Sequence, residues 1–399
     1  MLEKYAILNL ESGVAYVRRD RIKNLKAIDA IIFDCDGVLI DIRNSYDKAI
    51  SKAVAQIFEW LTGENISEDM ISPEIIFLFR RSGGFNNDWD IVYGILMFLI
   101  CELPKEAREK IGELIKAYIG EKDAAKRLLA VKNKSHLNME NFEAYLCKNL
   151  TSKFRDFSRF LDASGVVSVD RAVLNSGKVS DELYNLVKSF LYGSGKISDS
   201  IIARVFEEIF CGSDLFKEAY GIKPEIYSGS GIIENGKPII KHETLSRLSS
   251  MLGGLKFGIA SGSRLKSARH ILGNILEWFN PKARIFLDNV EKVEDEYAER
   301  GLRVSLKKPN PFSLFKSAEA LEPFRFALYV GDSMEDAMMV ENARRIDPSF
   351  LFAGVYEYTN LMDKAIEEFI NVSSDLILPS VNEIPNVIDA LRGGKIEGS

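Results

Sequence analysis

Histidine and cysteine are scarce in this chain of 399 residues, which contains three histidines and four cysteines. His136, His242 and His270 are too far apart for metal-ligand spacing, and the cysteines include no CxxC pair. This shortage argues against a histidine-rich metal centre, a zinc site or a disulfide framework. Widely spaced cysteines suit reduced thiols, so we expect a cytoplasmic protein.

Two further features are missing: a dense Lys/Arg tract and a long apolar run. The formal net charge is −6, so we expect neither nucleic acid nor a membrane as partner. The most apolar stretch, Ile91–Cys101, is about half as long as a membrane-spanning helix, and a buried helix explains it better. The N-terminal residues lack the pattern of a signal peptide, and their alternation predicts a small hairpin.

The remaining composition is that of a globular protein, with 46% hydrophobic and 28% charged residues. Apolar runs at 29–34, 256–261 and 325–332 each end in small or acidic residues and are followed by a helical pattern. This alternation predicts the α/β class, with a Rossmann-like three-layer core around a parallel sheet. Ligands bind at the carboxyl ends of such strands, so the residues that end the three runs should share one edge of the sheet.

The first and second runs are separated by roughly 200 residues, far too many for a loop. Helical periodicity fills this interval, most clearly at 45–61, 107–120 and 180–193. We therefore expect a mainly helical domain inserted into the α/β core. The predicted divisions are an N-terminal hairpin extension at 1–26, a core at 27–44 plus 241–399, and the insertion at 45–240.

Several residue types that serve phosphoryl transfer stand at the predicted strand ends. A carboxylate nucleophile needs a second acid for the leaving oxygen, a hard divalent cation, and groups that hold phosphoryl oxygens. Asp34 and Asp36 lie two residues apart in "DCDG", where Gly37 permits a sharp bend. Ser261 ends the second run, and its hydroxyl with the backbone N–H groups of Gly262 and Ser263 suits phosphate binding.

The later part of the chain supplies a cation and two more acids. Lys308 precedes a proline and is a candidate to reach the same edge, with Lys307 as the adjacent alternative. Asp332 ends the third run, and Asp336 should lie one helical turn further on the same face. These acids predict an oxygen-rich site for Mg²⁺.

The ordered set "DCDGVL", "IASGS", "KKPNP" and "GDSMED" resembles the four motifs of the haloacid dehalogenase-like hydrolase superfamily. The large insertion after the first motif looks like an enlarged form of its type-1 cap. The resemblance implies that Asp34 is the phosphorylated nucleophile and Asp36 the general acid/base. Dehalogenases of this superfamily lack a carboxylate at the position of Asp36, so its presence favours phosphoryl transfer.

The same resemblance implies the ligands of the metal and of the phosphoryl group. Mg²⁺ would lie between the Asp34 carboxylate, the Asp36 carbonyl and Asp332, with Asp336 nearby. Ser261 and Lys308 would hold the phosphoryl oxygens. A more local similarity, in "RRSGGFNNDWD" and "FCGSDLF", is to type-1-capped hydrolases described as phosphoglycolate-phosphatase-like, whose insert is usually smaller. It leads to the hypothesis that the cap contacts substrate through Arg80, Arg81, Asn86, Asn87 and Trp89.

Structural explanations compete with several of these roles. "DCDG" alone could be a turn in which aspartates bond their own backbone, and "GGFNNDWD" could be an ordinary loop and helix cap. Ser333 and Asp336 have capping-box spacing, Ser261 could be a simple N-cap, and Lys308 could be a solvated surface lysine.

The function that we predict from the sequence is a Mg²⁺-dependent phosphatase of a small phosphorylated metabolite, such as phosphoglycolate or a sugar phosphate, acting through an aspartyl phosphate. One alternative is a phosphomutase that uses the same residues. Another is a protein that binds phosphate or a partner without catalysis.

Overall fold

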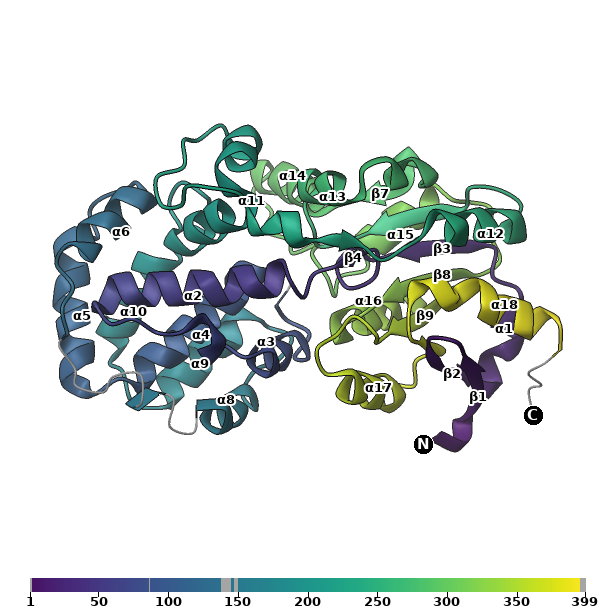
Figure 1. The fold of residues 1–399 in the computed structure, drawn as a ribbon, viewed down its shortest axis with the longest axis horizontal. Coiled ribbons are helices and arrows are strands. Elements are labelled where there is room, and N and C mark those ends of the chain that lie inside the picture. Colours follow the sequence, from purple (N-terminus) through teal and green to yellow (C-terminus); the bar gives the residue numbers. More distant parts are fainter. Residues whose placement is uncertain (1, 86, 138–144, 147–149, 395–399) are drawn as a thin grey trace. The chain divides into compact units, whose positions relative to one another are not determined.

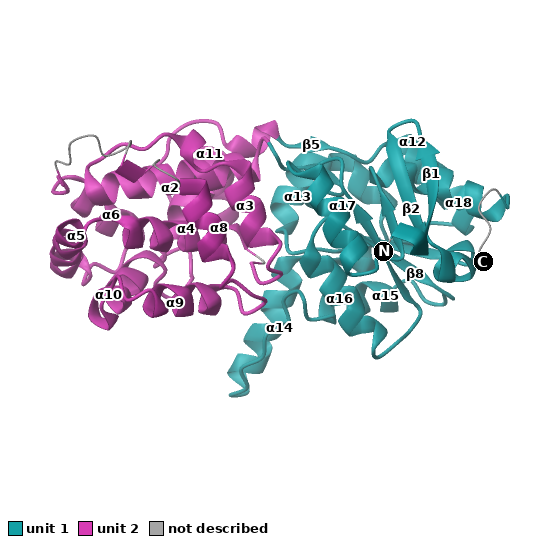
Figure 2. Ribbon diagram, turned by 90° about the horizontal axis from the view of Figure 1, so that it is seen from below, with its two compact units in different colours: residues 1–43, 236–399 teal, residues 44–235 magenta. Residues whose placement is uncertain are grey.

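The computed structural model describes residues 2–85, 87–137, 145–146 and 150–394. It divides the chain into two compact units, Met1–Arg43 with Gly236–Ser399, and Asn44–Asn235 (Figure 2). The first unit is built around a sheet, whereas the second is built from helices (Figure 1). We call them the core unit and the helical unit.

The core unit contains an eight-stranded sheet in the order β1-β2-β10-β9-β8-β3-β6-β7. The strands are β1 (Tyr5–Leu10), β2 (Gly13–Arg18), β3 (Ala30–Phe33), β6 (Phe257–Ala260), β7 (Arg284–Ile285), β8 (Ala327–Gly331), β9 (Phe350–Val355) and β10 (Leu376–Leu378). Neighbouring strands from β10 to β7 are parallel, while the β1–β2 hairpin joins β10 antiparallel. The predicted parallel α/β sheet is confirmed.

The strand order reverses direction between β8 and β3. From β3 the chain continues outward through β6 and β7, then returns to the other side of β3 with β8, β9 and β10. Such a switch point opens a crevice at the carboxyl ends of the strands, where α/β proteins bind ligands. Phe33 pairs with Val330, so the chain segments after β3 and β8 leave the sheet side by side at this point.

Helices cover the sheet and complete the Rossmann-like α/β core. They are α1 (Ile22–Lys26), α12 (His242–Leu252), α13 (Leu265–Leu272), α14 (Leu287–Glu299), α15 (Phe312–Glu319), α16 (Met334–Arg344), α17 (Met362–Asn371) and α18 (Ile384–Arg392). Leu314, Met339 and Phe369 bring α15, α16 and α17 into one hydrophobic cluster with Ile32 of β3. Phe33 faces the other side, where its ring meets that of Phe279 edge-on at 5.7 Å.

A short antiparallel ribbon marks where the chain leaves and re-enters the core unit. Its strands are β4 (Ile40–Asp41) and β5 (Lys237–Pro238), and Ile40 pairs with Pro238. The predicted N-terminal hairpin is also present, and its strand β2 extends the main sheet through β10. Tyr5 strengthens this connection because its buried hydroxyl donates to the Ser374 carbonyl at 2.9 Å.

The helical unit holds the insertion. Its described helices are α2 (Tyr46–Thr62), α3 (Pro73–Arg80), α4 (Asp88–Glu102), α5 (Lys105–Tyr118), α6 (Ala124–Lys132), α8 (Leu150–Ser158), α9 (Val166–Asn175), α10 (Asp181–Leu191) and α11 (Ile201–Tyr220). The helical patterns at 45–61, 107–120 and 180–193 correspond to α2, α5 and α10. The apolar run Ile91–Cys101 lies in α4 and is buried, as predicted. Within the described residues, no helix combines the length and hydropathy needed to span a bilayer.

Candidate active site

Asp34 and Lys308 form the centre of the site. Asp34 directly follows β3, whose four residues are buried on both faces of the sheet. Asp34 itself is 7% exposed. Lys308 is 8% exposed, and its Nζ lies 2.9 Å from Asp34 Oδ1 and 2.7 Å from Asp336 Oδ1. Lys308 is therefore a buried cation shared by two carboxylates, not a solvated surface lysine.

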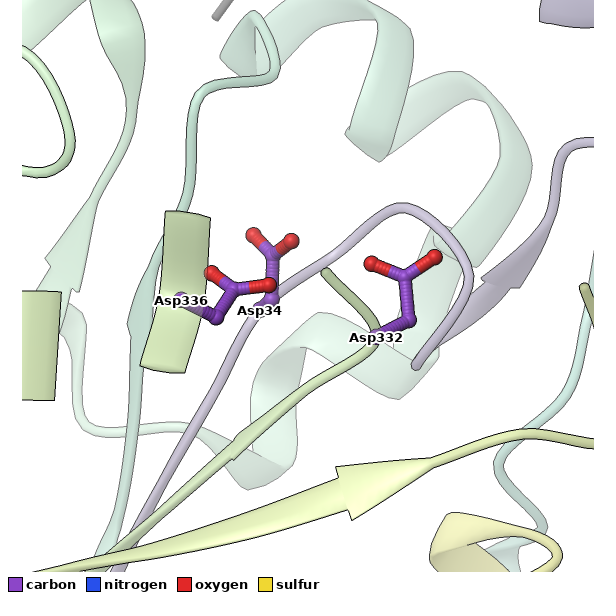
Figure 3. A group of neighbouring side chains, drawn as sticks. All are labelled: Asp34, Asp332 and Asp336. Atoms are coloured by element: carbon purple, nitrogen blue, oxygen red, sulfur yellow. The ribbon is translucent and has the colours of Figure 1, made fainter. Parts of the chain in front are cut away.

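Three carboxylates converge beside this ammonium group. Asp34 comes from the end of β3, Asp332 from the segment after β8, and Asp336 from the first turn of α16 (Figure 3). One oxygen from each lies within 4.8 Å of the others. Hard oxygen donors gathered this closely suit Mg²⁺, and a divalent cation would offset the excess of negative charge over the single lysine. The residues present therefore fit a magnesium site.

The protonation of the central pair depends on burial and on neighbouring charge. Burial raises the pKa of Asp34, Asp336 adds to this effect, and Lys308 and Ser261 oppose it; the net shift is upward. Burial alone would lower the pKa of Lys308, but the charges of Asp336 and Asp34 outweigh it and raise the pKa. Lys308 consequently stays charged at neutral pH.

Asp336 holds its neighbours through both carboxylate oxygens. Oδ1 accepts from Lys308 Nζ and from the Tyr329 hydroxyl at 3.0 Å, and Oδ2 accepts from the Ser333 hydroxyl at 2.7 Å. Ser333 and Asp336 form the capping box that their spacing indicated. Asp332 precedes the N-cap of α16, which begins at Met334, so it is not part of that helix, but one of its carboxylate oxygens lies within 4.8 Å of one from Asp336.

Tyr329 is a site residue that the sequence analysis missed. It lies fully buried in β8, and its hydroxyl also lies 2.8 Å from the Ala260 carbonyl at the end of β6. Burial raises the pKa of Tyr329, and the charges of Asp336 and Asp34 add to this. A single hydroxyl within an otherwise apolar buried strand was the available signal, since such a group needs a partner.

Asp36 is held by the turn that follows β6. Its Oδ2 accepts a hydrogen bond from the Ser263 hydroxyl at 2.7 Å, and the Ser263 hydroxyl lies 3.0 Å from that of Ser261. Gly262 separates the two serines. Helix α13 begins at Leu265 without a side-chain cap, so the reading of Ser261 as an N-cap is wrong. Two segments more than 200 residues apart in sequence thus meet through short side chains.

Two glycines allow the acidic segments to approach one another. Gly37 has φ +71°, and a Cβ atom there would lie 2.0 Å from Asp332 Oδ2. A Cβ on Gly331 would lie 2.4 Å from the Asp336 Cβ. Neither position can take a side chain without moving a carboxylate of the site.

A family model for haloacid dehalogenase-like hydrolases matches residues 28–344. The chain belongs to the haloacid dehalogenase-like hydrolases. No curated protein matches the sequence. An X-ray structure of a Northeast Structural Genomics Consortium target is similar in fold, with a TM-score of 0.56 and 18% sequence identity over 91% of this chain and 99% of that one. The family resemblance is thereby confirmed, and the chain is a hydrolase by family.

Within this hydrolase the two adjacent lysines have different partners. Lys307 Nζ lies 3.2 Å from Glu291 Oε1, on the partly exposed surface beside α14. Lys308 alone of the two is placed against Asp34. The alternative in which Lys307 reaches the phosphate-binding edge therefore loses its support.

The candidate substrate residues of the cap have partners inside the helical unit. Arg80 Nη1 lies 2.7 Å from Asp47 Oδ1, and Arg80 Nη2 lies 3.4 Å from Asp88 Oδ1. Burial raises the pKa of Asp88, with Arg80 opposing and Asp47 adding to the shift, and the net change is upward. Arg80 thus links the first turns of α2 and α4 to the end of α3.

The remaining cap residues surround the start of α4. Asn87 is its N-cap and accepts from the Trp89 backbone N–H at 2.8 Å, which agrees with the loop-and-cap reading. Trp89 is buried, and its indole N–H donates to Glu207 Oε1 at 3.1 Å. Arg81 is exposed. Asn86 lies outside the described residues, and contact of any of these residues with substrate stays a prediction.

Proposed function

We propose that this hydrolase is a Mg²⁺-dependent phosphatase that acts on a small phosphate monoester. The observation that carries the proposal is the buried Asp34 carboxylate, 2.9 Å from the Lys308 ammonium, within a group of three converging carboxylates. A nucleophilic carboxylate, a fixed cation and a set of metal ligands are the parts that phosphoryl transfer to an aspartate requires.

The first step transfers the phosphoryl group to Asp34. An Asp34 oxygen attacks phosphorus in line, the bond from phosphorus to the ester oxygen breaks, and Asp36 gives a proton to the departing oxygen. Lys308 and the Ser261 hydroxyl bind the oxygens of the transferred group. Mg²⁺, held by Asp34, Asp332 and the Asp36 carbonyl, would offset the negative charge of the carboxylates and phosphate.

The second step returns Asp34 to its starting state. Asp36 takes a proton from water, the water oxygen attacks phosphorus, and the bond from Asp34 to phosphorus breaks, which releases inorganic phosphate. The Ser263 hydroxyl keeps Asp36 oriented in the meantime, since it donates to Oδ2. One carboxylate thereby serves as acid in one step and as base in the next.

The substrate class that we propose is a small phosphorylated metabolite, such as phosphoglycolate or a sugar phosphate. Arg80 already faces two carboxylates, so its charge is largely balanced inside the helical unit. Arg81, which is exposed, is our candidate to bind a second anionic group of the substrate. Alanine at Arg81 should raise KM for an acidic substrate more than for a neutral one, and equal KM values would exclude this role.

The proposal is tested by phosphate release from a panel of phosphoglycolate, sugar phosphates and nucleotides, with Mg²⁺ or with EDTA. Asp34→Asn should abolish turnover, while Asp363→Asn, at an exposed aspartate of α17, should leave it unchanged. Release that survives Asp34→Asn or EDTA would contradict the mechanism. Transfer of phosphate within a sugar, with retained bisphosphate and little free phosphate, would instead identify a phosphomutase.

A further inference from the structure

Helix α14 contacts both segments that supply the proposed phosphate ligands. At its start, the Leu287 N–H donates to the Ser263 carbonyl at 3.0 Å, and Asp288 Oδ2 accepts from the Leu265 N–H at 2.8 Å. One turn before its end, Glu294 Oε1 accepts from the Leu306 N–H at 2.7 Å. The helix therefore spans from the turn after β6 to the segment that carries Lys308.

Glu291 lies between these two attachment points and binds a cation from each segment. Its Oε2 lies 3.0 Å from Arg264 Nη1, and its Oε1 lies 3.2 Å from Lys307 Nζ. Arg264 directly follows Ser263, and Lys307 directly precedes Lys308. Each cation is thus one residue away from a group proposed to act on the phosphoryl oxygens or on Asp36.

We propose that Glu291 is a positioning residue that sets the spacing between the Ser261–Ser263 turn and Lys308. This assignment rests on the proposed phosphatase function, because it concerns the phosphoryl site of that function. Without Glu291 the cations Arg264 and Lys307 would lose the carboxylate that they share, so their repulsion would shift the two segments while Asp288 and Glu294 still attach them to α14.

The other acids of α14 cannot replace this bridge. Asp288 lies 3.2 Å from Arg264 and serves only that side. In the part of the chain that the structure describes, Glu291 provides the ion pair of Lys307. Glu291 is partly exposed, with 33% of its side chain accessible, so its contribution to overall stability should be small. Its removal should therefore change phosphate binding more than folding.

The experiment compares wild type with Glu291→Gln, and with Glu296→Gln as a matched control on the exposed side of the same helix. Two quantities are measured with Mg²⁺ present: the affinity for inorganic phosphate by calorimetry, and kcat and KM for the best substrate. Glu291→Gln should weaken phosphate binding and lower kcat/KM by roughly tenfold, since small displacements of ligand-holding groups have large effects on rate. Its Tm should remain within about 2 °C of wild type.

A double variant shows whether Glu291 acts through Lys307. Lys307→Met should also weaken phosphate binding, and adding it to Glu291→Gln should produce little further loss, because Glu291→Gln already removes the contact between Glu291 and Lys307. Fully additive losses would contradict the bridge.

The outcomes separate this assignment from the proposed function. If the wild type is active and Glu291→Gln has the same phosphate affinity and kcat/KM as Glu296→Gln, the positioning role alone is overturned. Loss of Tm in Glu291→Gln without loss of phosphate affinity would also overturn it, in favour of a purely structural ion pair. Wild type that neither binds phosphate nor releases it from any substrate would overturn the proposed function and this assignment together.

Discussion

Replacing Gly37 by alanine should disable the site by displacing Asp332. Gly37 has φ +71°, a region that costs a residue with a Cβ roughly 1–2 kcal/mol. The added Cβ would lie 2.0 Å from Asp332 Oδ2 and 2.4 Å from its Cγ. Carbon and oxygen atoms that are not bonded lie about 3.3 Å apart or more, so either the Asp332 carboxylate or one of the two segments has to move by about 1 Å.

The backbone strain and the displacement of Asp332 that this substitution causes are detected by different measurements. The backbone cost lowers the free energy of unfolding, whereas the displacement changes the geometry of the carboxylates proposed to hold Mg²⁺. A misplacement of about 1 Å near reacting groups can reduce a rate by roughly 100-fold. We therefore expect Gly37→Ala to lose at least about 100-fold in kcat/KM and to need a higher Mg²⁺ concentration for half-maximal activity.

A glycine elsewhere in the core unit isolates the backbone cost. Gly253 ends α12 with φ +73°, and a Cβ there would meet nothing within 4 Å. Gly253→Ala should lose a similar 1–2 kcal/mol or so in urea unfolding yet keep its rate and its Mg²⁺ requirement. Equal kcat/KM and Mg²⁺ dependence in both variants would refute the reasoning, since the steric conflict would then have no effect on the site.

Three other predictions address separate parts of the molecule. Tyr329→Phe should lower kcat about tenfold in steady-state assays, because Asp336 loses a hydrogen bond to a charged group; an unchanged kcat would contradict this. Two lysines outweigh burial and lower the pKa of Glu102, so its stabilising effect is present above its ordinary pKa of 4.5 and is lost as pH falls. Urea unfolding should show Glu102→Gln less stable by up to about 1 kcal/mol at neutral pH, and this difference should shrink as pH falls below 4.5; a constant difference would oppose it. Burial raises the pKa of Cys101 to about 12, so iodoacetamide at mildly alkaline pH should label it only after unfolding, as judged by mass spectrometry.

Much of the α/β core could be predicted because it depends on local pattern. The strand before Asp34 is a short apolar run that stops at an acid, and the other two runs stop in the same way at the small residue Ser261 and at Asp332. Parallel strands bring such ends to one edge whatever the details of packing. The helices α2, α5 and α10 followed from periodicity in the same way.

The contacts that could not be predicted depend on register and on distant segments. Asp332 and Asp336 meet as expected, but the sequence did not show that Ser333 caps α16 and leaves Asp332 outside the helix. Arg80 was a candidate anion ligand, and the sequence did not show that it pairs with Asp47, more than 30 residues earlier in another helix. No spacing rule within the sequence relates these positions.

Glu291 illustrates the same limit within the core unit. It stands in an acidic helix whose charges look like an ordinary solvated face in the sequence. Only the fold shows that this glutamate meets one cation from each of two loops. A role of this kind becomes visible when the contacts of both loops are known.

The strand order of the sheet has a consequence for how the chain folds during synthesis. Val17 of β2 pairs with Leu376 of β10, and Phe33 of β3 pairs with Val330 of β8. The sheet therefore cannot be completed until the last strands have been synthesised. The helical unit, in contrast, is one continuous segment, so its first helix α2 can pack against its last helix α11 before the final core strands are made. We expect the helical unit to form while the core strands on either side of it are still unpaired. A ribosome-stalled chain that is long enough for residue 235 to have left the exit tunnel should then contain a protease-resistant helical unit flanked by an open N-terminal segment.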